Sequence, residues 1–448
     1  MPTLQIPHTK NDTKFLHFVR FRELEFWDYN TYFQNDIQKH TYPTVKLEEI
    51  IKQRKWSITI DDTLVYKRPT VKLYWKWVFL RDEIVWKDIK VKRQQICHAN
   101  DLLVAEIDAK VWGFWIIPDY LEWAIVSSHY FLFEVDTTKL SLAFISMYMQ
   151  TQEFQKQVQA TWSTNYAAIR PAHFLSYSIS LPDLDTQSRI VREYSDRMIE
   201  AERLDREVTS YEKDIETYLM DTLGITTPKR EQKKWLQFVR FRDLERWDAF
   251  NSENFFARSL YPIQAFGDLV DTWPHYWANT KTVKKITDIR YIRITDINED
   301  WSLNDEIVSA EEIDKKFFLG ENDFLLARSG NTVWKSFLYK EKYGKCIYAW
   351  YLVKYRLDFS KILPEYILYY TKSASFKHWI NISQRVAGQP NINGQEYLKF
   401  PIPLPPLSIQ SQIVEHIDAI KATITSARTR AESLRNEAKE NFERELFS

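Results

Sequence analysis

The chain repeats itself once, and this repeat limits the folds that it can adopt. Residues 15–28 read FLHFVRFRELEFWD and residues 235–248 read WLQFVRFRDLERWD, with ten of fourteen positions identical at an offset of 220. The stretch LPDLDTQSRIV from Leu181 recurs as LPPLSIQSQIV from Leu404, with seven of eleven positions identical at an offset of 223. Such duplication indicates that one structural unit is used twice. The chain is therefore predicted to run as unit, helix, unit, helix.

Each repeat ends in a long run with heptad spacing. Its apolar residues follow steps of three and four, which is typical of a helix that presents one narrow seam. These positions are Ala201, Leu204, Val208, Tyr211, Ile215 and Tyr218 in the first run, and Ile413, Ile417, Ile420, Ile424, Ala427, Ala431, Leu434 and Ala438 in the second. If the last helix folds back along the central one, both seams are buried, and we therefore expect an antiparallel coiled coil. The alternative is two amphipathic helices that each pack on a local core.

The predicted fold class is α+β, with two tandem α/β domains separated by the two long helices, which form an antiparallel coiled coil in a pseudo-twofold arrangement. The predicted boundaries are a polar tail at 1–14, a first domain at 15–182, a central helix at 183–224, a linker at 225–234, a second domain at 235–404 and a C-terminal helix at 405–448. Asp185 and Ser408 are predicted as the N-caps of the helices, and Gly224 as the C-terminal cap of the first. Inside the second domain, 286–294 and 324–327 are predicted as strands and 364–370 as a helix that begins at proline.

Composition excludes several classes of protein. Lys plus Arg and Asp plus Glu are both 61, so any nucleic acid must be bound by local basic patches. The eight glycines include no GxG or GK[ST] turn for a phosphate, and the two cysteines form no CxxC. We see no secretory signal and no apolar stretch of about 18 residues, so we expect a soluble, cytoplasmic protein.

Four further stretches occur in an order that points to a known family. They are YIRITDINEDW from Tyr291, NDFLLARSG from Asn322, AGQPNIN from Ala387 and IPLPPLSIQSQIVEHID from Ile402. Together with the duplication, they make the chain resemble the specificity subunit of Type I restriction-modification systems. The first domain departs from the pattern, because TNYAAIRP at residues 164–171 replaces GQPNIN.

The resemblance implies that the two domains are target-recognition domains of a non-catalytic subunit. Each domain would read one half of a split site on double-stranded DNA, in defence against phage. It also implies that the helices bind two methyltransferase subunits, which would use S-adenosylmethionine. Restriction and translocase subunits, where present, would use ATP and Mg. This chain itself would hold no cofactor and no metal.

Local basic clusters supply the predicted DNA contacts. Between residues 44 and 93 there are thirteen Lys or Arg against seven acids, with aromatic residues between them. The predicted contact residues are Arg54, Lys55, Lys67, Arg68, Lys72, Lys92 and Arg93 in the first domain, and Lys281, Lys284, Lys285, Arg290 and Arg293 in the second. A polar loop set adds Arg328, Ser329, Asn331, Arg385, Gln389 and Asn391 as contacts to bases or phosphates. The alternative is that these residues are solvated strand faces and ordinary turns.

Catalytic motifs are missing from the sequence. There is no [ND]PP[YFW] loop of an adenine methyltransferase and no GxSxG nucleophile elbow, and the nine histidines lack the spacing of zinc ligands. We therefore predict that the chain is not an enzyme. Two other functions remain open: the specificity subunit of a Type IIB-like system, and a coiled-coil adaptor that binds proteins.

Overall fold

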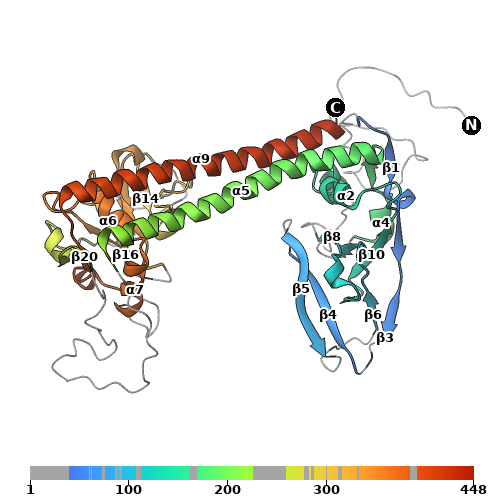
Figure 1. Ribbon diagram of the computed structural model, residues 1–448, viewed down its shortest axis with the longest axis horizontal. Helices are drawn as coiled ribbons and strands as arrows, with labels where there is room; N and C mark the ends of the chain where they lie inside the picture. The colour runs from blue at the N-terminus through green and yellow to red at the C-terminus, as the bar shows by residue number, and fades with distance from the viewer. Residues whose placement is uncertain are drawn as a thin grey trace, which may run out of the picture. The chain divides into compact units, whose positions relative to one another are not determined.

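The computed structural model describes most of the chain. The described residues are 40–59, 61, 63–72, 76–85, 89, 93–106, 113–160, 169–225, 259–276, 282–283, 287–298, 300–310, 315–329, 332–383 and 391–447. The predicted tail, almost all of the predicted linker and the repeated segments at 15–28 and 235–248 lie outside them. The chain divides into two compact units (Figure 1): unit 1 contains residues 1–203 and 430–448, and unit 2 contains residues 204–429. Each unit therefore takes part of both long helices.

Unit 1 is built around antiparallel strands. A four-stranded sheet has the order β2-β10-β7-β8, and a three-stranded sheet has the order β3-β6-β9. A long hairpin, β4-β5, and the pair β1-β11 complete the strands. Their bounds are Thr44–Lys46 (β1), Ile51–Arg54 (β2), Ser57–Thr59 (β3), Val65–Lys72 (β4), Lys76–Val85 (β5), Arg93–Ile96 (β6), Leu102–Ala105 (β7), Phe114–Ile116 (β8), Ile125–Val126 (β9), Tyr130–Val135 (β10) and Ser178–Ser180 (β11). The short helices α2 (Leu142–Tyr148), α3 (Gln152–Ala160) and α4 (Pro171–Ser176) contribute aromatic side chains to the core, where Phe144, Phe154 and Phe174 are buried with Phe133 of β10.

Unit 2 repeats this mixture with different details. Its buried strand β16 (Phe324–Ala327) lies between β17 (Ser336–Leu338) and β19 (Leu352–Tyr355). The remaining pairs are β12-β20, β13-β15 and the parallel pair β14-β18, with bounds Ile263–Ala265 (β12), Thr282–Val283 (β13), Arg290–Ile292 (β14), Ser309–Ala310 (β15), Cys346–Tyr348 (β18) and Pro401–Pro403 (β20). The helices are α6 (Pro364–Tyr370), α7 (Ala374–Ser383) and α8 (Gly394–Tyr397). The predicted strand at 324–327 and helix at 364–370 are confirmed.

The predicted strand at 286–294 is wrong over most of its length. Among the described residues 287–294, only Arg290–Ile292 form a strand, and Ile294–Asp296 forms a turn of 3-10 helix. The cause is local, because the Asp296 carboxylate accepts a hydrogen bond from the Arg293 backbone N–H at 2.9 Å and from its guanidinium at 2.6 Å. A side chain that caps a turn in this way competes with the strand ladder.

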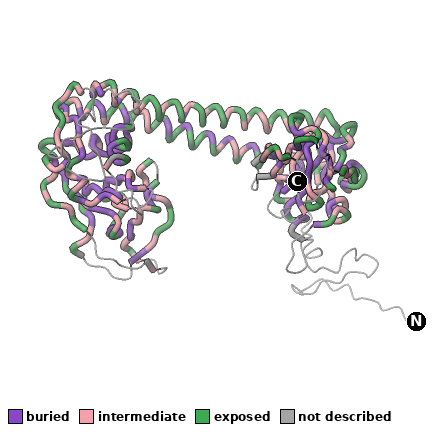
Figure 2. The backbone as a smooth tube through the Cα atoms, turned by 90° about the horizontal axis from the view of Figure 1, so that it is seen from below, coloured by how far each residue is buried: buried purple, intermediate pink, exposed green. Residues whose placement is uncertain are grey.

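The two long helices are α5 (Leu184–Leu223) and α9 (Leu407–Leu446), each of 40 residues. In unit 1 the start of α5 and the end of α9 share one core, through Ile190, Phe442 and Leu446. In unit 2 the start of α9 and the end of α5 share the other, through Ile413 and Leu223. Both views show the helices side by side (Figures 1 and 2), and the two pairings make them antiparallel. The predicted fold class is confirmed.

The seam between the helices is apolar on both sides. In unit 2, Val208 of α5 is buried with Ile424 and Ala427 of α9, and the side chains packed against them are Leu204, Tyr211, Ile215 and Ile420. In unit 1 the seam residues Ala201, Ala431, Leu434 and Ala438 are buried. Ile413 and Ile417 have a second role, because they belong to the core of unit 2 as well as to the seam. Removal of this apolar area from water stabilises the helix pair.

A glutamine fixes the start of each long helix to its own unit. Gln187 donates from Nε2 to the carbonyl oxygens of Lys139 and Pro182, both at 2.8 Å, and accepts from the Ser141 N–H at 2.8 Å. Gln410, its equivalent at the offset of 223, makes the same three kinds of bond, to Lys361 O at 3.0 Å, Pro405 O at 2.9 Å and the Leu363 N–H at 2.8 Å. Both glutamines are fully buried and belong to the repeated LP-L--QS-IV pattern. The duplicated motif therefore forms the same hydrogen-bonded joint, between a long helix and its own unit, twice in the chain.

The predicted N-caps are wrong by two residues. Helix α5 begins at Leu184, and Asp183 caps it by accepting from the Thr186 N–H at 2.9 Å, so Asp185 lies inside the first turn. Ser408 likewise lies inside α9, which begins at Leu407. The predicted glycine cap is confirmed, because Gly224 has a φ of 61° and the Ile225 N–H donates to Met220 O at 2.9 Å. This is the geometry of a Schellman cap.

Candidate DNA interface

In unit 1 the predicted cation Arg54 is engaged inside the protein. Its guanidinium lies 3.3 Å from a carboxylate oxygen of Asp101 and 3.7 Å from one of Glu134. Burial raises the pKa of Asp101, while the His98 N–H and Arg54 act against that rise. Asp101 corresponds to Asp323 in unit 2, which is also buried and lies 3.2 Å from Lys354. Each unit thus keeps a buried carboxylate at this equivalent position, paired with a basic side chain.

Replacing Arg54 with methionine is expected to lower the free energy of unfolding of unit 1 by about 1–3 kcal/mol at neutral pH. The loss follows because the buried Asp101 carboxylate would keep its desolvation cost without its nearest guanidinium. The pKa of Asp101 is raised in the folded state, so protonation favours folding, and the loss should shrink as the pH falls through that pKa. Urea unfolding at pH 7 and at pH 4 measures both effects. Lys52→Met, on the exposed face of the same strand, is the control and should be neutral; an equal loss there would contradict the assignment.

The other predicted contact residues of unit 1 differ in whether their side chains are already bonded to other parts of the protein. Arg68 of β4 forms a bidentate salt bridge with Asp82, its partner across the hairpin, and both N–O distances are 2.7 Å. Lys67 donates to the Tyr120 carbonyl at 3.0 Å, and Arg93 donates to Ser57 Oγ at 2.8 Å. Lys55 is exposed. Lys72 lies at the end of β4, and Lys92 lies outside the described residues.

In unit 2, Arg290 and Arg293 hold one loop. Arg290 donates to the carbonyl oxygen of Asn304 at 2.6 Å and to that of Glu306 at 3.2 Å. Arg293 lies 3.0 Å from a Glu306 carboxylate oxygen, and its hydrogen bond to Asp296 raises the pKa of the guanidinium. Both arginines therefore contact Glu306. The predicted contacts Lys281, Lys284 and Lys285 lie outside the described residues.

The polar loop set is partly brought together by the fold. Ser329 and Asn391 pair as an antiparallel bridge, and the Ile392 N–H donates to Arg328 O at 2.9 Å. The Arg328 guanidinium lies over the Tyr276 ring, 5.2 Å from its centroid, and its Nε is buried without a hydrogen-bond partner in the described part of the chain. Two motifs about 60 residues apart in sequence thus meet at one place. Asn331, Arg385 and Gln389 lie outside the described residues.

A group of cations around Trp301 was missed by sequence reasoning. Lys372 and Lys421 lie 4.5 and 4.8 Å from the centroid of the Trp301 ring, and burial lowers the pKa of both amines. The three residues come from a loop, from the turn after α6 and from α9, so no spacing in the sequence could have paired them. The tryptophan that ends the motif YIRITDINEDW thereby fixes its loop to α9.

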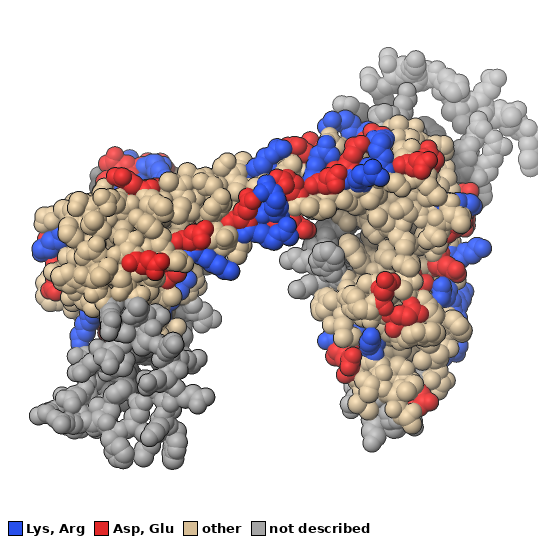
Figure 3. Space-filling model, in the orientation of Figure 1, with Lys and Arg blue, Asp and Glu red and all other residues tan. Residues whose placement is uncertain are grey.

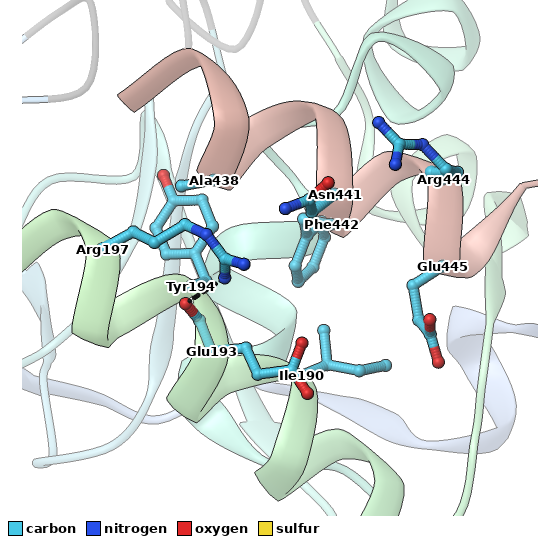
Figure 4. A pocket seen from close by; sticks show the side chains of 9 residues that line it. All are labelled: Ile190, Glu193, Tyr194, Arg197, Ala438, Asn441, Phe442, Arg444 and Glu445. Atoms are coloured by element: carbon cyan, nitrogen blue, oxygen red, sulfur yellow. Dashed lines mark hydrogen bonds between the residues drawn. The ribbon is translucent and has the colours of Figure 1, made fainter. Parts of the chain in front are cut away.

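The helix pair of unit 1 carries a groove of about 160 Å³ (Figure 4). The residues that line it are Ile190, Glu193, Tyr194, Arg197, Ala438, Asn441, Phe442, Arg444 and Glu445. Glu193 and Asn441 correspond, at the offset of 223, to His416 and Tyr218 of unit 2. Those two rings lie 3.8 Å apart between their centroids and occupy the equivalent place. The two helix pairs are therefore alike in backbone and different in surface.

The described residues offer no group of His, Cys, Asp and Glu side chains that could hold a metal ion. Both cysteines are buried and unpaired. Burial raises the pKa of the Cys97 thiol, and raises that of Cys346 to about 11, so neither is a reactive thiolate at neutral pH. In the part of the chain that is described, no helix combines the length and the apolar character needed to cross a membrane.

Comparison with known proteins gives matches in families and in solved structures. Residues 265–436 match the family model of the Type I restriction modification DNA specificity domain. A search of the curated proteins gives no match. A chain from a study of complex assembly and conformational transition of the Type I R-M system is 15% identical, with a TM-score of 0.55, over 90% of this chain and 96% of that one. At this identity the likeness concerns the fold.

Two further solved chains are similar at lower scores. The HsdS subunit from Thermoanaerobacter tengcongensis is 16% identical over 90% of this chain and 96% of its own, with a TM-score of 0.44. The S subunit of the Type I restriction-modification system from M. genitalium is 10% identical over 92% and 97%, with a TM-score of 0.47. The family match at residues 265–436 contains all four of the stretches that suggested the family. The predicted resemblance to the specificity subunits of Type I restriction-modification systems is therefore confirmed for residues 265–436, which match their DNA specificity domain.

Proposed function

We propose that this chain reads a bipartite DNA site, with one half contacted by unit 1 and the other by unit 2. The observation that carries the proposal is the match of residues 265–436 to a DNA specificity domain, combined with the duplicated joint at Gln187 and Gln410. Since unit 1 is attached to its helix in the same way as the matched unit, it is a second reader of the same kind. Between the repeated segments the two units differ in sequence, which supports different half-sites.

The chain acts in this proposal as a non-catalytic subunit in the cytoplasm. Its partners are two methyltransferase subunits, which dock on the coiled coil and use S-adenosylmethionine, and restriction subunits that use ATP and Mg. Figure 3 shows Lys, Arg, Asp and Glu side chains gathered along the long helices. Cross-helix pairs such as Arg428 with Glu212, at 2.8 Å, lie on this surface. Such exposed charges contribute little to stability and are available for a partner.

Methylome sequencing of cells that carry this chain with its methyltransferase tests the proposal. We expect one motif of two short specific halves separated by a fixed number of unspecified bases, with a modified adenine in each half. Arg328→Ala should relax base preference in one half and leave the other unchanged, because Arg328 belongs to unit 2 alone. The exposed Lys342→Ala, on a 3-10 turn of the same unit, is the matched control. A short continuous motif would contradict the two-reader model.

The other two functions give different results in simple experiments. A Type IIB-like system would yield the same motif, but the chain would co-purify with a fused methyltransferase-nuclease. A protein-binding adaptor would leave no motif, and its complex would show no salt-sensitive retention on duplex DNA.

A further inference from the structure

Unit 1 exposes two tryptophans around one histidine. The Trp56 ring stacks on His98, with 5.6 Å between the centroids and 26° between the planes. The Trp123 ring meets the same imidazole edge-on at 4.9 Å. The two tryptophans are 57% and 61% exposed, although burial of such rings is a main source of stability in cores. We call Trp56, His98 and Trp123 the aromatic platform.

The platform is held by hydrogen bonds and not by a core. His98 Nδ1 lies 2.8 Å from a Glu122 carboxylate oxygen, and the Ala99 N–H donates to the same carboxylate. The backbone of Trp123 has a φ of 64°, which bulky residues rarely adopt, and its N–H donates to Cys97 O at 3.0 Å. This left-handed residue turns the indole outward. Exposed aromatic rings that are grouped and held in place are typical of a surface that binds a partner.

Basic groups surround the platform. Lys55, next to Trp56, is exposed. The hydrogen bond from the Ala99 N–H lowers the pKa of Glu122, and the charges of His98 and Arg54 act in the same direction. Lys67 donates to the carbonyl oxygen of Tyr120, in the turn just before Trp123. Rings bordered by cations are the arrangement that binds bases by stacking and phosphates by charge.

We propose that the aromatic platform is a stacking site for a nucleobase that is turned out of the duplex in the DNA half-site that unit 1 reads, with the open face of Trp56 against the base. The inference rests on the proposed function and deepens it, because it names where the first half-site is contacted. The base continues the Trp56–His98 stack, and Lys55 lies beside it for the phosphate. Trp123 supports His98 from the edge.

The test measures binding of the full chain, purified with its methyltransferase, to a duplex that contains the methylome motif. Trp56→Leu should weaken binding about tenfold, because one base–ring stack contributes on this scale. Trp56→Phe keeps a ring and should retain most of the affinity. Trp273→Leu, which removes the 73% exposed tryptophan of unit 2, is the matched control and should leave binding unchanged.

A second readout locates the contact. Duplexes with 5-iodouracil at successive thymines are irradiated, and the crosslinked peptide is identified by mass spectrometry; we expect Trp56 to crosslink in one half-site only. Unchanged affinity of Trp56→Leu, with crosslinks elsewhere, overturns the platform and leaves the proposed function standing. Loss of the methyltransferase from the Trp56→Leu complex, with normal DNA binding by what remains, would make the platform a protein interface and also overturn it. Failure of the unsubstituted complex to bind DNA overturns both proposals.

Discussion

Replacing Phe442 with alanine is expected to lower the free energy of unfolding of unit 1 by about 3–5 kcal/mol, the usual cost of removing a buried phenylalanine ring. Phe442 lies in the last turns of α9, yet its ring contacts Phe144 of α2 and Tyr194 of α5, with centroids 5.9 Å apart in both cases. It is buried in the same core cluster as residues nearly 300 positions earlier in the chain. The substitution therefore tests whether the end of the chain closes unit 1.

Hydrogen exchange resolved to peptides is the suitable measurement, because a chain of two units need not unfold in one step. Peptides from α2 and β10 should lose protection in Phe442→Ala, while peptides from α6 and β16 of unit 2 should keep theirs. Lys439→Ala, three residues earlier on the exposed face of α9, is the control. Leu219→Ala, at the position equivalent to Phe442, should act on unit 2 instead. Equal loss of protection in both units from Phe442→Ala would contradict this division.

The sequence predicted the fold where its signals were periodic or duplicated. Heptad spacing identified the faces that meet, so that Val208 and Ile424 share one cluster. A run of apolar residues predicted the strand β16, and Pro364 predicted the start of the helix α6. The N-caps were misplaced because Asp183 and Asp185 are both good capping residues, and only the backbone geometry selects between them.

The candidate DNA contacts were harder to predict, because sequence shows a charge and not its partner. Arg54, Arg68 and Arg293 lie in a basic stretch, but their carboxylate partners Asp101, Asp82 and Asp296 lie 47, 14 and 3 residues away. Their intramolecular pairs order the loops that carry other groups. Whether they also contact DNA stays a prediction.

The aromatic platform, in contrast, is a candidate contact site that was not predicted from the sequence. Trp56 is one of the aromatic residues of the basic stretch at 44–93, but no pattern in the sequence connects it with His98 and Trp123. They come from separate turns, and the outward direction of Trp123 depends on a left-handed backbone that no sequence pattern signals. The high tryptophan content was the one available hint, and by itself it does not separate core rings from exposed ones.

Replacing Gln410 with leucine is expected to destabilise unit 2 by about 2–4 kcal/mol, although leucine is apolar and of similar size. The reason is that the Lys361 and Pro405 carbonyl oxygens and the Leu363 N–H would lose their partner at a site where water has little access. A buried polar group left without a hydrogen bond costs about 1–3 kcal/mol. Because Leu363 precedes α6, the substitution should also loosen the junction between α6 and α9.

Peptide-resolved hydrogen exchange measures this loss, with α6 and the first turns of α9 as the reporting segments. Gln412→Leu, two residues further on an exposed position, is the matched control and should change nothing. Gln187→Leu should produce the same loss in unit 1, in the segment before α2, since Gln187 makes the same set of bonds. If the two substitutions act alike, each in its own unit, the repeated motif was kept to attach each unit rigidly to its helix. If Gln410→Leu leaves α6 fully protected, the motif has no such role, and the likeness of the two joints is only inherited from the duplication.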